Sequence, residues 1–409
     1  MKIEYKLQDK FDVISFASVC LLIAMGIVAI FSATVNHPTA SGNAERQLVW
    51  AGVSVIVFFF IYFLPHRTFR LLAVPAYLSS LILLIVVIFA GKVVYGAKSW
   101  LALGPFGFQP SEFGKIGLIL FLAYWLTHKK RNINNFTDIS STILIGSIPV
   151  LLILLEPDLG TAIVYIAVTV FMLFWGGINL FGLFVVVSPG LVVFASLFGT
   201  APLLVALGFI LIGLYYFKRN LFTSASVFVA NISAAFLFDY ALRLLQPHQQ
   251  RRIASFLDPT ADPLGSGYNA MQAKVAIGSG GLLGKGFLEG NQTQLRFIPE
   301  QWTDFIYCVI GEEFGFIGSF LTITLFIIVF IRLLDIAYSS KDEFGSAIVI
   351  GTLSLYFIHF VINIGMNIGI APVIGLPLPF LSYGGSSLLV NFMLLGIVFN
   401  IYRNRKEKI

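Results

Sequence analysis

Charged residues are scarce in this chain of 409 residues, where Asp, Glu, Lys and Arg together make up 11%. Soluble domains carry about 25%. Outside residues 246–302, the polar stretches are shorter than roughly 20 residues, far below the length of a folded domain. A separate soluble domain is therefore not expected. Apolar residues make up 58% of the chain and Phe alone occurs 41 times, so the sequence predicts an integral membrane protein.

Cysteine is also rare. Cys20 and Cys308 are the two in the chain, and they predict no disulfide framework. The net charge of +6 could suggest binding to nucleic acid. However, Lys and Arg cluster in short segments between apolar runs, which is the pattern of membrane topology. We therefore expect a membrane protein with no nucleic-acid partner.

Apolar runs long enough to cross a bilayer, about 20 residues, occur at twelve places. The sequence thus predicts an all-α polytopic membrane protein with about 10–12 transmembrane helices, forming a single membrane domain over residues 1–409. The boundaries blur within 176–245. The runs lie near residues 11–34, 47–64, 71–90, 111–128, 138–156, 158–176, 180–198, 201–217, 221–245, 303–332, 345–370 and 381–402.

The distribution of basic residues predicts the orientation. If both termini are cytoplasmic, most of the 26 Lys and Arg fall in short inside segments, as the positive-inside rule requires. The large loop 246–302 then faces outward, and its residues 268–277 suggest a short helix lying along the interface. The shorter loop 91–110 also faces outward, with Trp100 at headgroup level.

Asp304 is the strongest candidate for a functional residue, because it stands where the chain re-enters the membrane after the large loop. A carboxylate at such a place is costly and is functional by default. The alternative is an N-cap for the next helix, with Thr303 beside it. Glu312 lies eight residues further on, so we expect it on the same helix face about 12 Å deeper.

Three further charged residues stand at the mouths of apolar runs. Glu112 and Lys115 are three apart and share a helix face, as partners in a structural ion pair or as parts of a site. Asp158 follows a break at Pro157 and is as readily a helix cap as a site residue. In the large loop, Arg252 and Lys274 are among several cations that suit an anionic group such as pyrophosphate.

Several long motifs occur in a fixed order. They are GAKSWLALG, FQPSEFGK, EPDLGTA, DPLGSGYN, AIGSGGLLGKG, QTQLRFIPEQWTDFI, GEEFGFIG and GLPLPFLSYGGSS. With these motifs the chain resembles the SEDS family of shape, elongation, division and sporulation proteins. The stretches GNQTQLRFIPE and AKVAIGSGGLLGKG are more similar to its elongation members than to its division members. The family usually has ten spans, so the resemblance implies an extra helical pair within 176–245.

The resemblance implies a peptidoglycan glycosyltransferase that polymerises lipid II into glycan strands at the outer face of the bacterial inner membrane. Its implied partners are a class B penicillin-binding protein, which cross-links the strands, and other membrane proteins of the elongation complex. Asp304 matches the essential aspartate of the family's TDF motif. Glu112 and Lys115 match QPSE-x-x-K, Asp158 matches PDLG, and Arg46 matches the basic residue before the second span.

Chemically, we expect Asp304 to act as a general base on the acceptor hydroxyl, with a cation nearby to keep it ionised. Undecaprenyl pyrophosphate would leave as an anion, stabilised by Arg46, Lys115 and the loop cations or by a divalent metal ion. No cofactor is certain. One displacement predicts inversion at the donor sugar. The alternatives are a lipid II flippase and a non-catalytic scaffold for the cross-linking enzyme.

Overall fold

Twelve long helices take up the twelve apolar runs of the sequence. The structure, a computed structural model, describes residues 10–94, 97–103, 106–128, 133, 135–258 and 265–406. In that part of the chain, nine helices are long and apolar enough to cross a membrane, and α6 and α7 are shorter apolar helices. The predicted all-α membrane fold is therefore confirmed. The twelve helices are α1 (Val13–Thr34), α2 (Asn43–Phe63), α3 (Arg67–Ala90), α4 (Pro110–Leu126), α5 (Phe136–Leu155), α6 (Leu159–Trp175), α7 (Leu180–Ser196), α8 (Thr200–Phe217), α9 (Leu221–Leu244), α14 (Gly315–Ser339), α15 (Glu343–Ile368) and α16 (Gly385–Asn404).

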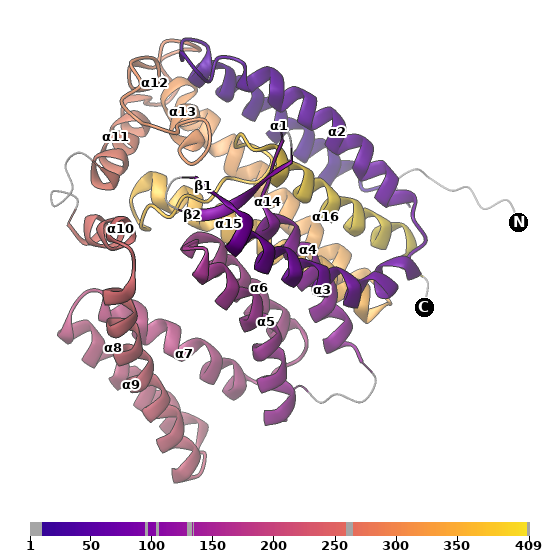
Figure 1. Cartoon of the computed structure of the whole chain (residues 1–409), viewed down its shortest axis with the longest axis vertical. Coiled ribbons are helices and arrows are strands. Elements are labelled where there is room, and N and C mark those ends of the chain that lie inside the picture. Colours follow the sequence, from indigo (N-terminus) through magenta and orange to yellow (C-terminus); the bar gives the residue numbers. More distant parts are fainter. Residues whose placement is uncertain are drawn as a thin grey trace, which may run out of the picture.

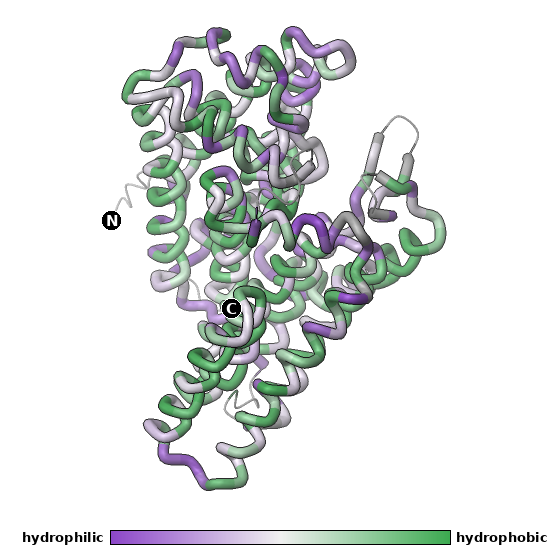
Figure 2. Tube along the Cα trace, turned by 90° about the vertical axis from the view of Figure 1, so that its left-hand side faces the viewer, coloured by the Kyte–Doolittle hydropathy of each residue, from purple (hydrophilic) through white to green (hydrophobic). Residues whose placement is uncertain are grey.

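The main bundle is built around α15 and α16, whose residues are mostly buried. Helix α3 packs on α4, α2 packs on α16, and α6 packs on α15 (Figure 1). Hydrophobic residues run along the helices, and hydrophilic residues gather at the loops at either end (Figure 2). This distribution is what a bilayer imposes, because it solvates apolar side chains and excludes charged ones.

Helices α7, α8 and α9 project from the main bundle (Figure 1) and share a small core of their own. Asn231 on α9 donates a hydrogen bond to Ser188 on α7 at 3.1 Å, which ties the two helices together away from water. The extra helical pair expected within 176–245 thus corresponds to part of a three-helix unit. The prediction of one domain over residues 1–409 stays a prediction. The buried residues of this small core are Val192, Ile210, Leu214, Val227 and Ala235.

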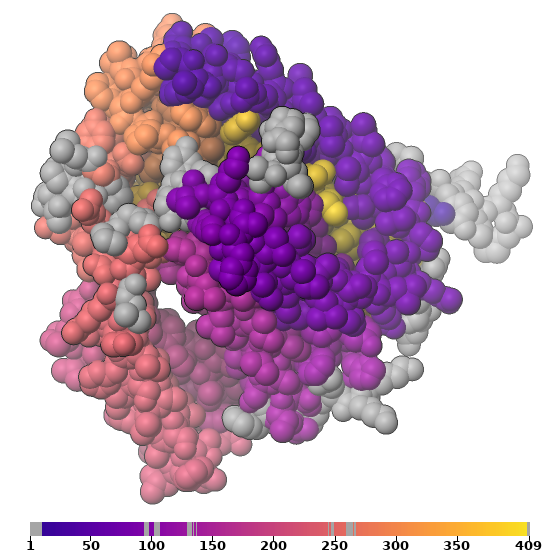
Figure 3. Space-filling model, viewed as in Figure 1, coloured from indigo at the N-terminus to yellow at the C-terminus, as the bar shows by residue number. Residues whose placement is uncertain are grey.

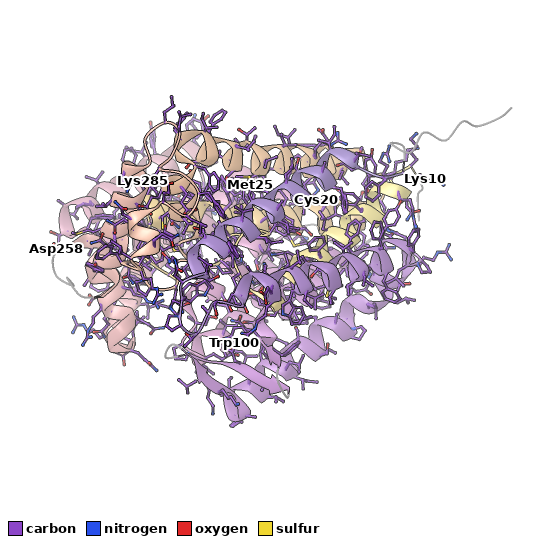
Figure 4. All side chains as sticks on the ribbon, turned by 90° about the horizontal axis from the view of Figure 1, so that it is seen from above. Lys10, Cys20, Met25, Trp100, Asp258 and Lys285 are labelled. Atoms are coloured by element: carbon purple, nitrogen blue, oxygen red, sulfur yellow. The ribbon has the colours of Figure 1, made fainter. Side chains whose placement is uncertain are left out.

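The large loop after α9 contains short helices, as its composition predicts. These are α10 (Pro247–Leu257), α11 (Ser266–Ser279) and α12 (Asn291–Gln294), followed by α13 (Ile306–Glu313). They lie at one end of the molecule, and the start of α1 and the end of α16 lie at the other (Figure 1). Viewed from above, Lys285 and Asp258 of the loop are accordingly far from Lys10 (Figure 4).

The expected span at 303–332 is wrong as a single helix. Helix α13 ends at Glu313, and α14 begins at Gly315, which has a φ of +61°. A side chain there would collide with the backbone of Gly284, so the break requires glycine. Glu312 belongs to α13 and does not continue a face that begins at Asp304. The sequence pattern missed this break because both sides of it are apolar.

Three short strands between α3 and α4 form a small antiparallel sheet that was not predicted from the sequence. Its strands are β1 (Lys92–Val94), β2 (Ala97–Leu103) and β3 (Phe106–Phe108), in the order β1-β2-β3. Leu101 pairs with Phe108, and the ring of Trp100 lies against Gly107. The sheet holds Trp100 against the cavity described next.

Candidate active site

A cavity of about 2970 Å³ opens between the main bundle and the α7–α10 segment. In the space-filling view, the surface is hollowed between α10 and the neighbouring α5–α6 segment (Figure 3). Its wall combines apolar residues of α6, α7 and α9 with polar residues of α2, α4, α10 and two loops. Of the residues predicted to form a site, five line it: Arg46, Glu112, Asp158, Arg252 and Asp304.

Asp304 lies on a loop two residues before α13, and its backbone is firmly held. Its amide donates to Glu300 O at 3.2 Å, and its carbonyl oxygen accepts hydrogen bonds from Asn363 Nδ2 at 2.9 Å and Asn367 Nδ2 at 3.1 Å. The alternative of an N-cap is wrong, because the cap residue of α13 is Phe305 and no side-chain cap bond is made. The carboxylate is half-buried in the cavity wall.

The surroundings of Asp304 change its acidity. Burial raises its pKa to about 6, Arg252 works in the opposite direction, and Glu300 adds to the rise. Gly375, with a φ of +82°, lies directly against the carboxylate: a Cβ there would be 3.2 Å from Asp304 Oδ2 and 3.7 Å from Arg252 Nη1. The cation that the sequence analysis expected beside Asp304 is therefore Arg252.

Glu112 and Lys115 form the ion pair that their spacing suggested. Lys115 Nζ lies 2.6 Å from Glu112 Oε1, and both residues are almost fully buried. Lys115 Nζ is also 3.3 Å from His359 Nε2 on α15. Glu112 lines the cavity, whereas Lys115 stands behind it. The pair thus joins the cavity wall to the centre of the bundle.

Asp158 and Arg46 are held differently. Asp158 caps α6, because its carboxylate accepts hydrogen bonds from Thr161 N at 3.0 Å and Thr161 Oγ1 at 2.8 Å. It still lines the cavity, so the cap is established and a role in binding stays a prediction. Arg46 lies inside the first turn of α2 and is exposed to the cavity.

Lys274 and Glu312 lie away from this cavity. Lys274 is exposed on α11, where its side chain packs against Gly369. Glu312 was expected deep on the face of Asp304, but it anchors the large loop. It accepts hydrogen bonds from Lys285 Nζ at 3.0 Å and from the backbone amides of Gln292 and Thr293 at 2.9 Å each. Its function is therefore to hold α12 against α13.

No cluster of three or more His, Cys, Asp or Glu side chains suited to a metal ion occurs in the described ranges. We assign no step to the divalent metal ion that the chemistry of the leaving group left open.

Several polar residues around Asp304 were not predicted from the sequence. Asn363 and Asn367 hold its carbonyl oxygen, and His359 contacts Lys115. These three residues are spaced four apart in an otherwise apolar helix, a pattern that could have identified them because buried polar groups in a membrane are rare and functional. Gln249, which lines the cavity and donates to Pro157 O at 2.9 Å, was also missed.

The fold and the site together define a polytopic membrane protein with a charged cavity near the end that carries its large loop. Comparison with known proteins identifies the family. The cell cycle protein family of FtsW, RodA and SpoVE matches residues 13–197 and 179–407. The chain belongs to this family, as its motifs predicted.

Individual relatives agree with this assignment. The chain is 33% identical over 428 residues to the peptidoglycan glycosyltransferase RodA of Treponema pallidum, covering 96% of this chain and 97% of the relative. It is 35% identical over 391 residues to the peptidoglycan glycosyltransferase MrdB of Escherichia coli, covering 94% and 93%. RodA-type proteins, to which the sequence analysis pointed through its elongation motifs, are thus among its relatives.

Solved structures share the fold. A chain from a peptidoglycan synthase complex that coordinates polymerization and crosslinking superposes with a TM-score of 0.71 at 29% identity, covering 97% of this chain and 99% of that chain. The rod shape determining protein RodA of Thermus thermophilus superposes with a TM-score of 0.65 at 26% identity, covering 100% and 99%. The match extends over the whole length of both chains.

Proposed function

We propose that this peptidoglycan glycosyltransferase polymerises lipid II during cell elongation, with Asp304 as the general base. The observation that carries the proposal is a half-buried carboxylate in the wall of a large cavity, next to an arginine. A carboxylate with a raised pKa accepts a proton more readily than an ordinary one, and one with a pKa of about 6 is still mostly ionised at neutral pH. Both properties suit a base.

The reaction would join two lipid-linked sugars. A hydroxyl oxygen of the acceptor attacks the anomeric carbon of the donor, and its proton passes to Asp304. The bond from that carbon to the phosphate oxygen breaks, and undecaprenyl pyrophosphate leaves with the bonding electrons. Because the leaving group is a stable anion, no strong general acid is required. A single displacement inverts the configuration at the donor sugar.

The leaving pyrophosphate needs positive charge near it. Arg46 and Arg252 line the cavity and are suited to bind phosphate oxygens in pairs of hydrogen bonds. Lys115 would act mainly through Glu112, because it lies behind the cavity wall. Asp158 would orient the sugar from the start of α6. Lys274 as a substrate contact stays a prediction that the cavity lining does not support.

A class B penicillin-binding protein is the partner we propose, together with other membrane proteins of the elongation complex. The solved relative from a peptidoglycan synthase complex supports this. We also propose that the protein resides in the bacterial inner membrane with both termini cytoplasmic and the cavity on the outer side. The excess of Lys and Arg in the short loops on the side of the termini supports that orientation.

The test is polymerisation of labelled lipid II by the purified protein with its partner. Asp304→Asn keeps the shape but cannot accept the proton, so we expect the rate to fall by about 10²–10⁴-fold. Glu45→Gln is a matched control, because it removes another carboxylate from the same cavity wall and should retain activity.

Three outcomes would contradict the proposal. Polymerisation by Asp304→Asn at a rate close to wild type would exclude this base. Lack of polymerisation by the wild-type complex, with lipid II moving across vesicle membranes instead, would favour the flippase. Lack of both activities would favour the scaffold.

A further inference from the structure

Three polar residues form a stripe along one face of α15. His359, Asn363 and Asn367 are spaced four apart, so they span about 12 Å along the helix axis. Their exposures are 2%, 0% and 0%. Burying such groups inside a membrane protein is costly unless each makes hydrogen bonds, and each of these does.

The two asparagines at the loop end of the stripe hold Asp304. As described above, both donate to the Asp304 carbonyl oxygen. Asn367 Oδ1 also accepts from Cys308 N at 3.2 Å, which fixes the start of α13. The two side-chain amides are linked to each other, since Asn367 Nδ2 donates to Asn363 Oδ1 at 3.3 Å. The loop that carries the carboxylate is thus bound to a rigid helix.

The same stripe holds the loop between α15 and α16 on the other side of the carboxylate, which we call the proline-rich loop because it contains Pro372, Pro377 and Pro379. Asn363 Nδ2 donates to Leu376 O at 2.7 Å. The two loops are also joined directly, because Ser382 Oγ donates to Thr303 O at 2.5 Å and Tyr383 N donates to Trp302 O at 2.9 Å. Asn363 therefore binds both the loop that carries Asp304 and the proline-rich loop.

His359 connects this arrangement to the buried ion pair. Its Nδ1 lies 2.9 Å from Pro377 O, which can only accept, so Nδ1 carries the proton. In the neutral ring Nε2 is then an acceptor and faces Lys115 Nζ at 3.3 Å. A single ring thus ties Lys115 on α4 to the proline-rich loop.

We propose that Asn363 and Asn367, with His359, are positioning residues that fix the Asp304 carboxylate relative to Lys115 and the cavity. This inference rests on the proposed function of Asp304. None of the three lines the cavity, so they act through Asp304 and Lys115 and do not contact substrate.

Removing the donors from Asn363 should lower kcat and leave binding of lipid II nearly intact. A misplacement of about 1 Å can cost about 10²-fold in rate, so we expect kcat to fall roughly 10–100-fold and KM to change less than about threefold. Asn363→Leu is the first variant, because Leu has the same branching and no donor.

The pH profile separates positioning from a general loss of structure. The charged groups that act on Asp304 are Arg252 and Glu300, besides its own burial. A carboxylate released from its buried place would regain water, so its pKa would fall from about 6 toward the ordinary value. The acid limb of kcat/KM should therefore move to lower pH in Asn363→Leu, a shift that destabilisation alone does not produce.

A matched control comes from the far end of the bundle. Asn400 on α16 is equally buried, and its Nδ2 donates to the carbonyl oxygens of Tyr62 at 3.0 Å and Leu64 at 2.7 Å. Asn400→Leu removes the same kind of contact away from the cavity. We expect it to lower the melting temperature while kcat and the acid limb stay within about twofold and 0.2 pH units of wild type.

The experiment measures initial rates of lipid II polymerisation from pH 5 to 8.5 for wild type, both Leu variants and Asp304→Asn. If Asn363→Leu does not fold, Asn363→Ser retains one donor in a smaller side chain and is used with Asn367→Ser. Unchanged kcat and acid limb in these variants, with Asp304→Asn inactive, would overturn the positioning inference alone. Activity in Asp304→Asn would overturn the proposed function itself.

Discussion

Arg252→Gln offers a quantitative test of how the cavity sets the acidity of Asp304. The two side chains approach the same point beside Gly375, which places Asp304 Oδ2 and Arg252 Nη1 no more than about 7 Å apart. At an effective dielectric constant of about 20, opposite unit charges at this distance attract by about 2 kcal/mol. Both side chains keep contact with the open cavity, so screening by water reduces this to about 1–1.5 kcal/mol.

That energy corresponds to about one pKa unit. The cation favours the ionised carboxylate, so its removal must raise the pKa of Asp304, from about 6 to about 7. At pH 6.5 the ionised fraction would fall from about three quarters to about one quarter. We therefore expect the acid limb of kcat/KM, which reports the free enzyme, to move upward by about one pH unit.

The assay is the initial rate of lipid II polymerisation by the complex between pH 5 and 8.5. Arg251→Gln is the control, because Arg251 is the neighbouring arginine on α10 and also lines the cavity, yet it is not among the groups that shift the pKa of Asp304. The electrostatic reasoning would be refuted if the acid limb of kcat/KM in Arg252→Gln stays in place or moves to lower pH. An equal shift of the acid limb in Arg252→Gln and Arg251→Gln would also refute it.

Three further predictions concern other parts of the chain. A cysteine at the exposed Asn291 should react with an impermeant thiol reagent added outside, and labelling only after the membrane is opened would reverse the proposed orientation. Lys115→Met leaves the Glu112 carboxylate buried without its partner, so thermal unfolding in detergent should show a loss of about 3–5 kcal/mol, and an unchanged melting temperature would contradict this. Gly375→Ala strains a φ of +82° against the Asp304 carboxylate and should reduce kcat by at least tenfold, whereas Gly42→Ala, with open space around it, should not.

The helical architecture was largely predictable because the bilayer acts on every residue of a span. Eleven of the twelve apolar runs became one helix each, and the run at 303–332 became α13 and α14. The small sheet at 91–110 was not predictable, because its strands are as short as three residues and periodicity needs longer segments. The break before Gly315 was missed because it depends on contact with Gly284, which is distant in sequence.

The candidate site was predictable in its charged residues and not in its supporting contacts. Asp304 and Glu112 stood out as charges at the mouths of apolar runs, and Arg252 as a cation of the large loop. All three line one cavity. Glu312 was also singled out for its charge. Its partners lie in the folded loop around Thr293, and no local sequence pattern indicates these contacts. Lys274 was predicted from its charge alone, and on α11 it does not line the cavity.

Asp304 lies on a loop, so its position depends on contacts from other parts of the chain. Groups on helices are held more accurately than groups on loops, yet the base proposed here has to be reached by a large lipid-linked substrate. Here the carboxylate is on a loop, and α15 binds the backbone of that loop through Asn363 and Asn367. Helix α15 fixes the position of the loop, and the loop places the Asp304 carboxylate in the wall of the cavity. Because the bonds go to the carbonyl oxygen, the carboxylate oxygens remain available for the acceptor hydroxyl and for Arg252.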